Sequence, residues 1–264
     1  MKAHRICLTL SLLAAATGAA AQATIDHDKA MAGNVTPGDA PGYPVTISVP
    51  GHYVLKGNLQ VPANEGGIHI TAGNVTLDLN GFAVAGPGTC LAGTSQVACN
   101  LPGTASTAER WAMSGVLVSS SASGVTVRNG SVRGVRGYGV AGDGLLLQDL
   151  VVEHNRYSGI RIGSFSKPSI ISMARIRSNG GHGIEGSYVI VERSAINSNG
   201  GHGMSTTQAQ VIDSRVVRNV LRGISSAGSY HSLVRNSDLR DNGQGATAGS
   251  VLSQGGNYNG AALF

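Results

Sequence analysis

The sequence predicts an all-β solenoid, a parallel β-helix built from stacked coils of short strands. Three observations predict it: a repeat of 20 to 24 residues, apolar residues alternating with polar ones inside each repeat, and Asn or Gly between the alternating runs. Helices of the same length would place apolar residues at i, i+3, i+4 and i+7, and the repeats do not. Leucine-rich repeats have a similar length but require an L-x-x-L-x-L skeleton, which these repeats lack.

The repeats come into register when one Asn in each copy is aligned. The anchors are Asn155, Asn179, Asn199, Asn219 and Asn242, and an earlier copy has Val135 at this position. Three residues before the anchor the column is Val132, Val152, Ile176, Ile196, Val216 and Leu239, and five residues after it the column is Val140, Ile160, Ile184, Met204 and Ile224. The last copy is expected to be one residue shorter there and to supply Ala246. Because equivalent residues of a β-helix stack about 4.8 Å apart, these columns predict buried aliphatic ladders and an amide ladder at the anchor.

Other columns predict small inward residues and glycine turns. The small residues between the two apolar columns are Ala174, Ser194, Ser214 and Ser237. Glycine is frequent, at 39 of 264 residues, and does not follow the three-residue period of collagen. We expect the glycines to occupy turn positions that need a positive φ.

The N-terminus predicts export. Lys2 and Arg5 precede a short apolar run from Ile6, and small residues then lead to A-x-A sites that end at Ala21 or Ala23. This pattern is typical of a secretory signal peptide, here residues 1–23, rather than of a buried N-terminal helix. We therefore expect a periplasmic or secreted protein. No later stretch reaches the roughly 18 apolar residues that a membrane-spanning helix needs.

The charge and the aromatic content argue against nucleic acid as the partner. Removal of Lys2 and Arg5 with the signal peptide would lower the formal net charge from +5 to +3, which is only mildly basic. Aromatic residues make up 4% of the chain, whereas proteins that bind single strands need interleaved aromatic side chains for stacking.

Three segments flank or interrupt the β-helix, which is expected over residues 51–246. Residues 24–50 and 247–264 are expected to cap its open ends, which would otherwise expose unpaired strand edges. Residues 86–112 form a long loop without periodicity that holds Cys90 and Cys99. In an exported protein these cysteines predict a disulfide, and the alternative of a metal site lacks further ligands nearby. The loop also carries Trp111, which could stack on a sugar ring or pack over apolar surface.

Two segments carry a resemblance to known proteins. In GHYVLKGNLQVPANEGGIHITAGNVTLDLNGFAVAG (51–86) and GVTVRNGSVRGV (124–135) the chain resembles secreted bacterial right-handed parallel β-helix repeat proteins of the pectate-lyase-like superfamily. The resemblance extends from residue 45 to about residue 246. It implies a single-stranded, right-handed parallel β-helix with capped ends. It implies no one activity, because the superfamily includes lyases, hydrolases, adhesins and phage tailspikes.

Gly-His-Gly occurs in RSNGGHGI (177–184) and again in NSNGGHGM (197–204), and it is a signature tripeptide of polygalacturonases. That resemblance would make His182 and His202 catalytic. Glycoside hydrolysis also needs paired carboxylates, and the Asn-Thr-Asp, Asp-Asp and Arg-Ile-Lys motifs of that family are missing from the sequence. Since the repeat places both histidines at one turn position, we expect stacked turn residues. The alternative is a pair that contacts a ligand or weakly binds a transition metal.

The outward residues of the main repeated strand mix acids and arginines. Successive coils are expected to bring together Glu153 and Arg177, Arg193 and Asp213, and Arg215 and Asp238. Arg133, Arg175 and Arg240 have no evident acidic neighbour. They could grip an anionic sugar through bidentate hydrogen bonds, or they could be ordinary solvated surface. Three clustered acids that might bind Ca²⁺, as a pectate-lyase-like activity would require, are not visible.

These patterns favour an exported, non-catalytic protein that binds carbohydrate or associates with the cell envelope. The candidate ligand-contacting residues are Trp111, Arg133, Arg175, His182, His202 and Arg240, and no catalytic residue, metal ligand or cofactor is predicted. An acidic polysaccharide is the expected partner. Two alternatives stay open: a polysaccharide lyase or glycoside hydrolase with a reduced site, and a surface adhesin or spacer.

Overall fold

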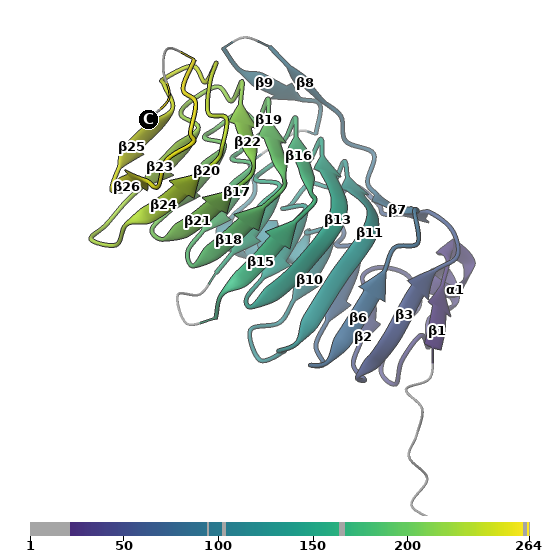
Figure 1. Ribbon diagram of the computed structural model, residues 1–264. Coiled ribbons are helices and arrows are strands. Elements are labelled where there is room, and N and C mark those ends of the chain that lie inside the picture. Colours follow the sequence, from purple (N-terminus) through teal and green to yellow (C-terminus); the bar gives the residue numbers. More distant parts are fainter. Residues whose placement is uncertain (1–21, 94, 102–103, 164–166, 261–262, 264) are drawn as a thin grey trace, which may run out of the picture.

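The chain forms a parallel β-solenoid in which every repeat adds one coil (Figure 1). The computed structural model describes residues 22–93, 95–101, 104–163, 167–260 and 263. The predicted signal peptide therefore lies outside the described residues, apart from its last two. In the described ranges no helix is long and apolar enough to cross a membrane. The predicted all-β solenoid is confirmed, with very little helix.

Three rows of strands run along the solenoid, and the first two belong to one 15-stranded sheet. The first row is β1 (Gln22–Ile25), β3 (Gly51–Leu55), β6 (Val75–Asp78), β11 (Val125–Arg133), β13 (Leu145–Glu153), β15 (Ser169–Ser172), β18 (Val189–Glu192), β21 (Ala209–Ile212), β24 (Ser232–Arg235) and β26 (Val251–Ser253). The second row is β4 (Leu59–Gln60), β7 (Ala83–Ala85), the C-terminal halves of β11 and β13, β16 (Arg175–Arg177), β19 (Ala195–Asn197) and β22 (Arg215–Val217).

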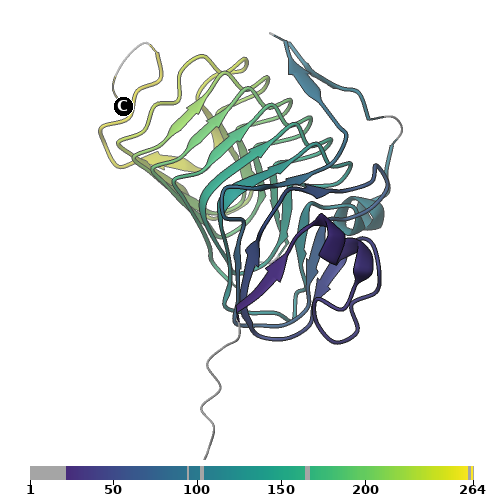
Figure 2. The ribbon, with the colours of Figure 1, turned by 90° about the vertical axis from the view of Figure 1, so that its right-hand side faces the viewer.

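The third row is a separate nine-stranded sheet. It consists of β2 (Val45–Ile47), β5 (Ile68–Ile70), β10 (Val116–Val118), β12 (Val140–Gly142), β14 (Ile160–Ile162), β17 (Ile184–Gly186), β20 (Met204–Thr206), β23 (Ile224–Ser226) and β25 (Thr247–Gly249). Seen toward its N-terminal end, the solenoid encloses one core between the rows (Figure 2). All pairings along the three rows are parallel, so each strand repeats its predecessor one coil later.

The predicted inward columns form the core. Every member of the column from Val132 to Leu239 has an exposed fraction of 0%, and the column from Val140 to Ile224 is at most 1% exposed. The expectation for the last coil is wrong by one residue: Thr247, not Ala246, stands opposite Ile224. The coil therefore keeps its full length at that point, and a threonine ends the aliphatic column.

The anchoring asparagines form the predicted amide ladder. The Nδ2 of each donates to the Oδ1 of the next at 2.9 to 3.0 Å, from Asn155 through Asn242. Each of these Oδ1 atoms also accepts the backbone N–H of the preceding anchor. Buried polar groups are tolerated when all their hydrogen bonds are made, which explains five buried amides in one column.

A second polar ladder runs through the small inward column. The Oγ atoms of Ser194, Ser214 and Ser237 each accept a backbone N–H from the coil before, at 3.0 to 3.2 Å. Each hydroxyl donates to the carbonyl two residues earlier in its own coil. Serine therefore fits here because one small side chain both donates and accepts at the corner.

The corner between the first and second rows differs from the expected glycine turn. It lies in the left-handed region at φ 46° to 58°, but it is built by Asn129, Asp149, Met173, Arg193, Asp213 and Asn236. Asn and Asp tolerate this conformation, whereas Met173 and Arg193 adopt it at a steric cost. These side chains are exposed, as outward positions should be. Asn129 and Asp149 lie within β11 and β13, whereas the other four stand between strands.

The two ends of the solenoid hold strands as well as flanking structure. Residues 24–50 contain half of β1 and all of α1 (His27–Ala32) and β2, and α1 lies outside the first strands (Figure 1). Residues 247–264 supply β25 and β26, so the strand rows continue past residue 246. The capping of both ends stays a prediction.

Candidate functional site

The predicted loop at residues 86–112 contains regular secondary structure in its described parts, 86–93, 95–101 and 104–112. It contains an antiparallel hairpin, β8 (Cys90–Ala92) and β9 (Val97–Cys99), and the helix α2 (Thr107–Ala112). The predicted disulfide between Cys90 and Cys99 is present in the structure and joins the two strands. A capping box of Ser106 and Glu109 begins the helix. The sequence shows no periodicity here because all three elements are too short to produce one.

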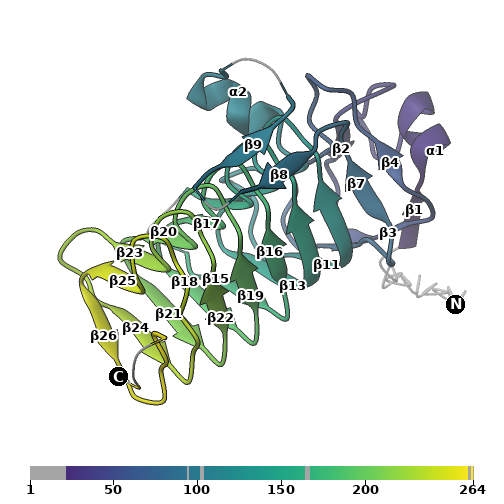
Figure 3. The ribbon, with the colours of Figure 1, turned by 90° about the horizontal axis from the view of Figure 1, so that it is seen from above.

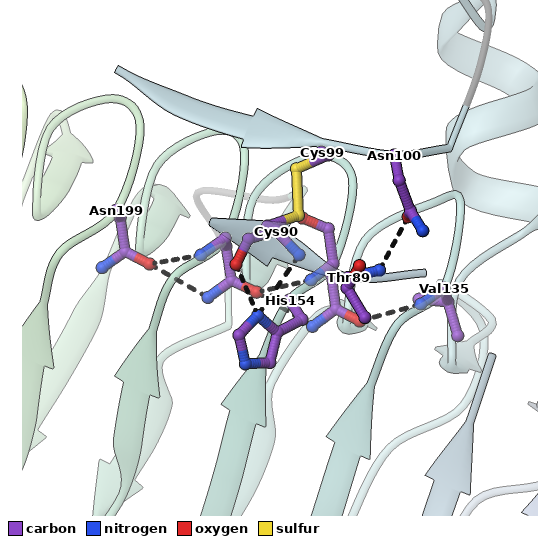
Figure 4. Close-up of a disulfide and its surroundings, with 9 residues drawn as sticks. Thr89, Cys90, Cys99, Asn100, Val135, His154 and Asn199 are labelled. Carbon is purple, nitrogen blue, oxygen red and sulfur yellow. Dashed lines mark hydrogen bonds between the residues drawn. A yellow bond between two sulfur atoms is a disulfide. The ribbon is translucent and has the colours of Figure 1, made fainter. Parts of the chain in front are cut away.

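The hairpin lies along the ridge between the second and third rows. Cys90 Sγ lies 3.6 Å from Asn155 O, and His154 Nδ1 lies 2.8 Å from Cys90 O (Figure 4). A Cβ on Gly180 would lie 2.8 Å from Cys99 Sγ, and one on Gly200 would lie 3.2 Å from Val97 Cβ. The first glycine of each NGGHG motif is therefore required by close packing, not by a positive φ.

His182 and His202 form a stack within the turn. Their rings lie 5.2 Å apart, centroid to centroid, at an interplanar angle of 5°. The Nδ1 of His182 accepts the backbone N–H of His202 at 2.9 Å, and the Nδ1 of His202 accepts that of Arg222 at 3.1 Å. Burial lowers the pKa of both histidines, His182 in spite of the nearby Glu185. This geometry supports the expected structural role, since a histidine that accepts through Nδ1 is neutral.

Trp111 packs in part and stays partly exposed. Its ring meets the Tyr138 ring edge-on at 5.8 Å, and the adjacent Tyr157 ring carries the Arg110 guanidinium at 4.2 Å. The Trp111 ring also closes over Gly163, where an added Cβ would lie 3.0 Å from it. Tyr138 thus positions the ring, as the packing interpretation expects, and the exposed part of the ring borders the third row of strands. Stacking on a sugar ring stays a prediction.

A cleft lies beside Gly163 on the outer face of the third row. Its volume is about 210 Å³, and its lining residues include Arg161, Gly163, Glu185, Ser187, Ser205 and Thr207. Arg161 and Glu185 form an ion pair with Nη1 and Oε1 2.6 Å apart, and their side chains are 27% and 29% exposed. The second carboxylate oxygen of Glu185 accepts the Ser158 hydroxyl at 2.7 Å. The cleft thus combines a charged pair with several hydroxyls, and the Trp111 ring stands at its edge, beside Gly163.

Arg133, Arg175 and Arg240 lie elsewhere, on the outer face of the second row. Arg133 lines a hollow of about 510 Å³ together with Arg177 and Glu153, and Arg175 is exposed on β16. The expectation that Arg240 lacks an acidic neighbour is wrong, because its Nε lies 3.2 Å from Asp238 Oδ2. That carboxylate is shared with Arg215, at 3.4 Å. This partner stands two residues earlier in the same coil, not on a neighbouring coil.

The predicted ion pairs are partly confirmed. Arg177 binds Glu153 at 2.7 Å, and Arg215 binds Asp238. Arg193 and Asp213 sit at corners, and Asp213 instead accepts a hydrogen bond from Asn236 at 3.2 Å. Among the described residues, no three His, Cys, Asp or Glu side chains gather in a way that could hold a metal ion.

Comparison with known proteins agrees with this architecture. Residues 52–260 match the family described as right-handed β-helix region. The chain belongs to the right-handed β-helix family. This confirms the handedness that the resemblance implied. A search of curated proteins found no match to the chain.

Several solved structures share the family's fold with this chain. The periplasmic alginate epimerase AlgG matches with a TM-score of 0.58 at 13% identity, over 81% of this chain and 54% of its own. The catalytic domain of a GH87 α-1,3-glucanase in complex with nigerose has a TM-score of 0.54 at 12% identity, over 86% and 40%. The Dettilon tailspike protein has a TM-score of 0.53 at 14% identity, over 79% and 50%. This chain thus spans about half the length of the epimerase, and the likeness establishes the fold alone.

Sequence reasoning missed Arg161 and Glu185. A signal for them existed: they occupy the outward position of the third-row strand, one residue after the buried Ile160 and Ile184, and the register pairs them on neighbouring strands. Only the outward positions of the second row were compared along the repeat. Trp111 could not have been placed beside them, because the insertion that carries it has no repeat to align.

Proposed function

We propose that this right-handed β-helix protein is an exported polysaccharide-binding protein whose ligand lies in the cleft on the third row. The observation that carries the proposal is the cleft, which combines the Arg161–Glu185 pair with the hydroxyls of Ser205 and Thr207 and has the Trp111 ring beside Gly163 at its edge. Sugar sites combine an apolar ring surface with a few fixed polar groups, and this cleft offers both. The folds of an alginate epimerase and of an α-1,3-glucanase bound to nigerose support a polysaccharide as the ligand class.

Binding is favoured over catalysis by the state of the cleft's carboxylate. Both oxygens of Glu185 are already engaged, one by Arg161 and the other by Ser158. The nearby His182 is held as an acceptor by the backbone of the next coil. A general acid or base must be able to exchange a proton with the substrate, and the Glu185 carboxylate and the His182 Nδ1 are already hydrogen-bonded within the protein. Because Arg161 and Glu185 neutralise each other, the cleft is suited to hydroxyl groups and sugar rings.

The test is affinity electrophoresis in gels that contain neutral or acidic polysaccharides, among them α-1,3-glucan and alginate. Retention by at least one polysaccharide should persist at about 0.5 M salt, where exposed charges are screened. Trp111→Ala and Ser205→Tyr should each weaken that retention at least about fivefold, since a ring contact and access to the cleft are lost. Met31→Ala removes an exposed apolar side chain from α1, which contributes no residue to the cleft, and should change nothing. Retention of both cleft variants at the wild-type level would contradict the proposal.

A polysaccharide-cleaving enzyme is the second candidate, favoured by a second carboxylate near the cleft. Asp143 accepts the Gly163 N–H at 2.8 Å, and Glu185 lies on the other side of Arg161. Paired carboxylates are the groups that glycoside hydrolysis requires. Reducing and unsaturated ends should be assayed on the same panel. Product formation that Glu185→Gln abolishes while retention persists would establish the enzyme instead of the binding protein.

A further inference from the structure

The outer face of the second row carries a row of arginines, which we call the arginine face. It is formed by β11, β13, β16, β19 and β22, and its members are Arg133, Arg175, Arg177, Arg215 and Arg218. All five side chains are exposed. The hairpin on the ridge separates this face from the cleft, because it contacts His154 at the end of β13 and the turn that leads to the third row (Figure 3).

Strand register fixes the spacing of the arginines. Arg133, Glu153, Arg177 and Asn197 follow one another in one column. A second column, two residues earlier in each coil, runs through Ser131, Val151, Arg175, Ala195 and Arg215. Successive members of a column lie about 4.8 Å apart. The guanidinium groups therefore recur along the solenoid axis at intervals of two coils.

The carboxylates of this face hold two of the arginine side chains in position and leave the positive charge of the other three unpaired. Glu153 is 14% exposed and lies beneath Arg177, which is 53% exposed. Asp238 is 19% exposed and holds both Arg215 and Arg240. Among the described residues, Arg133, Arg175 and Arg218 have no carboxylate within 4.0 Å. Each pair thus fixes an outer guanidinium, while three further guanidinium groups stay unpaired.

The surface between the arginines is hollowed. One hollow of about 510 Å³ contains Arg133, Arg177 and Ser131, and another of about 130 Å³ contains Arg215, Arg218 and Asn197. Arg175 stands between them, because its strand neighbours Val151 and Ala195 line the first and the second hollow respectively. The small and aliphatic residues leave room for a chain to lie flat across several coils.

We propose that the arginine face is a second binding site, distinct from the cleft, and that it takes a linear acidic polysaccharide along the solenoid axis. Arg133, Arg175 and Arg218 would bind its carboxylates or sulfates through bidentate hydrogen bonds, because a planar guanidinium presents two parallel N–H donors to such groups. The chemistry favours a glycan over a single-stranded nucleic acid. Such strands need aromatic side chains on which bases stack, and the described outward residues of this face offer aliphatic and polar groups, with Tyr258 only at its C-terminal end.

The test compares wild type with the triple variant Arg133→Gln/Arg175→Gln/Arg218→Gln. Retention in alginate gels at low salt should weaken at least about tenfold in the triple variant, since hydrogen bonds to charged groups are the strongest of their kind. A matched variant, Lys29→Gln/Lys56→Gln/Arg235→Gln, removes three charges from other parts of the surface and should bind like wild type. Unchanged melting by circular dichroism will show that the triple variant is folded, since all three side chains are exposed.

Three outcomes would overturn the proposal. The triple variant could bind alginate like wild type, or the matched variant could lose as much binding, which would make the effect one of net charge. Single-stranded DNA could compete with alginate at equal charge concentration, which would remove the preference for a glycan. Trp111→Ala separates the two sites: it should keep low-salt binding to alginate and lose only the salt-resistant binding attributed to the cleft.

Discussion

Polar side chains in the core and turns of this solenoid form hydrogen bonds with the equivalent positions of adjacent coils. The Asn199 amide donates to Asn219 on the next coil, the Ser214 hydroxyl accepts the Ser194 N–H of the coil before, and the His202 Nδ1 accepts the Arg222 N–H of the next coil. This explains why histidine can occupy a half-buried turn: its Nδ1 replaces a backbone acceptor, and its ring stacks on its neighbour. The Gly-His-Gly tripeptide is therefore a structural element of the coil here.

The histidine stack predicts a loss of stability in acid. Burial lowers the pKa of His182 and His202 below their ordinary value of about 6.5, so the unfolded chain binds more protons than the folded one just below that pH. The free energy of unfolding should therefore fall as the pH drops below about 6.5 and level off once the folded stack is protonated. Tm measured from pH 8 to pH 5 should show this fall in the wild type.

His182→Asn/His202→Asn should flatten that pH dependence, because asparagine can accept a hydrogen bond but cannot take up the proton. His231→Asn changes an exposed histidine on a turn and should leave the dependence as it is. Parallel Tm curves for the wild type and the double variant below pH 6.5 would show that the stack is not the cause.

At the scale of the element, one coil is too small to fold alone and is stabilised by its neighbours. Strands of three or four residues supply inward aliphatic side chains that touch the coils before and after them, as Ile196 does between Ile176 and Val216. The hairpin of β8 and β9 breaks this rule. It pairs only with itself and depends on the disulfide and on contacts to the ridge to stay in place.

Adjacent residues of β19 should respond in opposite ways to the same new charge. Ile196→Asp puts an unpaired carboxylate into a column that is 0% exposed, and it should destabilise the protein by about 4 kcal/mol or more. Asn197→Asp puts the same group on the outer face opposite Arg177 and should change stability by no more than about 0.5 kcal/mol. Thermal melting by circular dichroism measures both. Equal melting temperatures would refute the strand register.

At the scale of the whole molecule, the solenoid presents different chemistry on different faces. The third row offers a neutralised pair, hydroxyls and an aromatic ring, and the second row offers unpaired guanidinium groups. The stapled hairpin lies between them. A protein of this shape could hold two glycan chains at once, one on each side of the ridge, if both proposed sites are occupied.

The first strand of the solenoid predicts the site of signal-peptide cleavage. β1 pairs with β3 from Gln22 onward, and Ala23 packs against the core. Cleavage after Ala23 would remove half of this outermost strand, whereas cleavage after Ala21 leaves it whole. The mature protein should begin at Gln22, which intact mass measurement and N-terminal sequencing of the exported protein will check. A mature chain that begins at Thr24 would rule this out.

The sequence repeat by itself determined the fold, the number of residues in a coil and the inward columns, because residues that are buried in every coil recur as apolar residues at a fixed spacing. It also predicted the amide ladder and the disulfide, which depend on residue type and spacing. Only the tertiary structure decided what stands beside Trp111, that Arg240 has an acidic partner, and that corners hold Met173 and Arg193 at positive φ. The contacts of Trp111 arise because an insertion without a period meets the coils. The Asp238–Arg240 pair lies within one coil and the corners recur in every coil, but both depend on backbone geometry that the residue types alone do not fix.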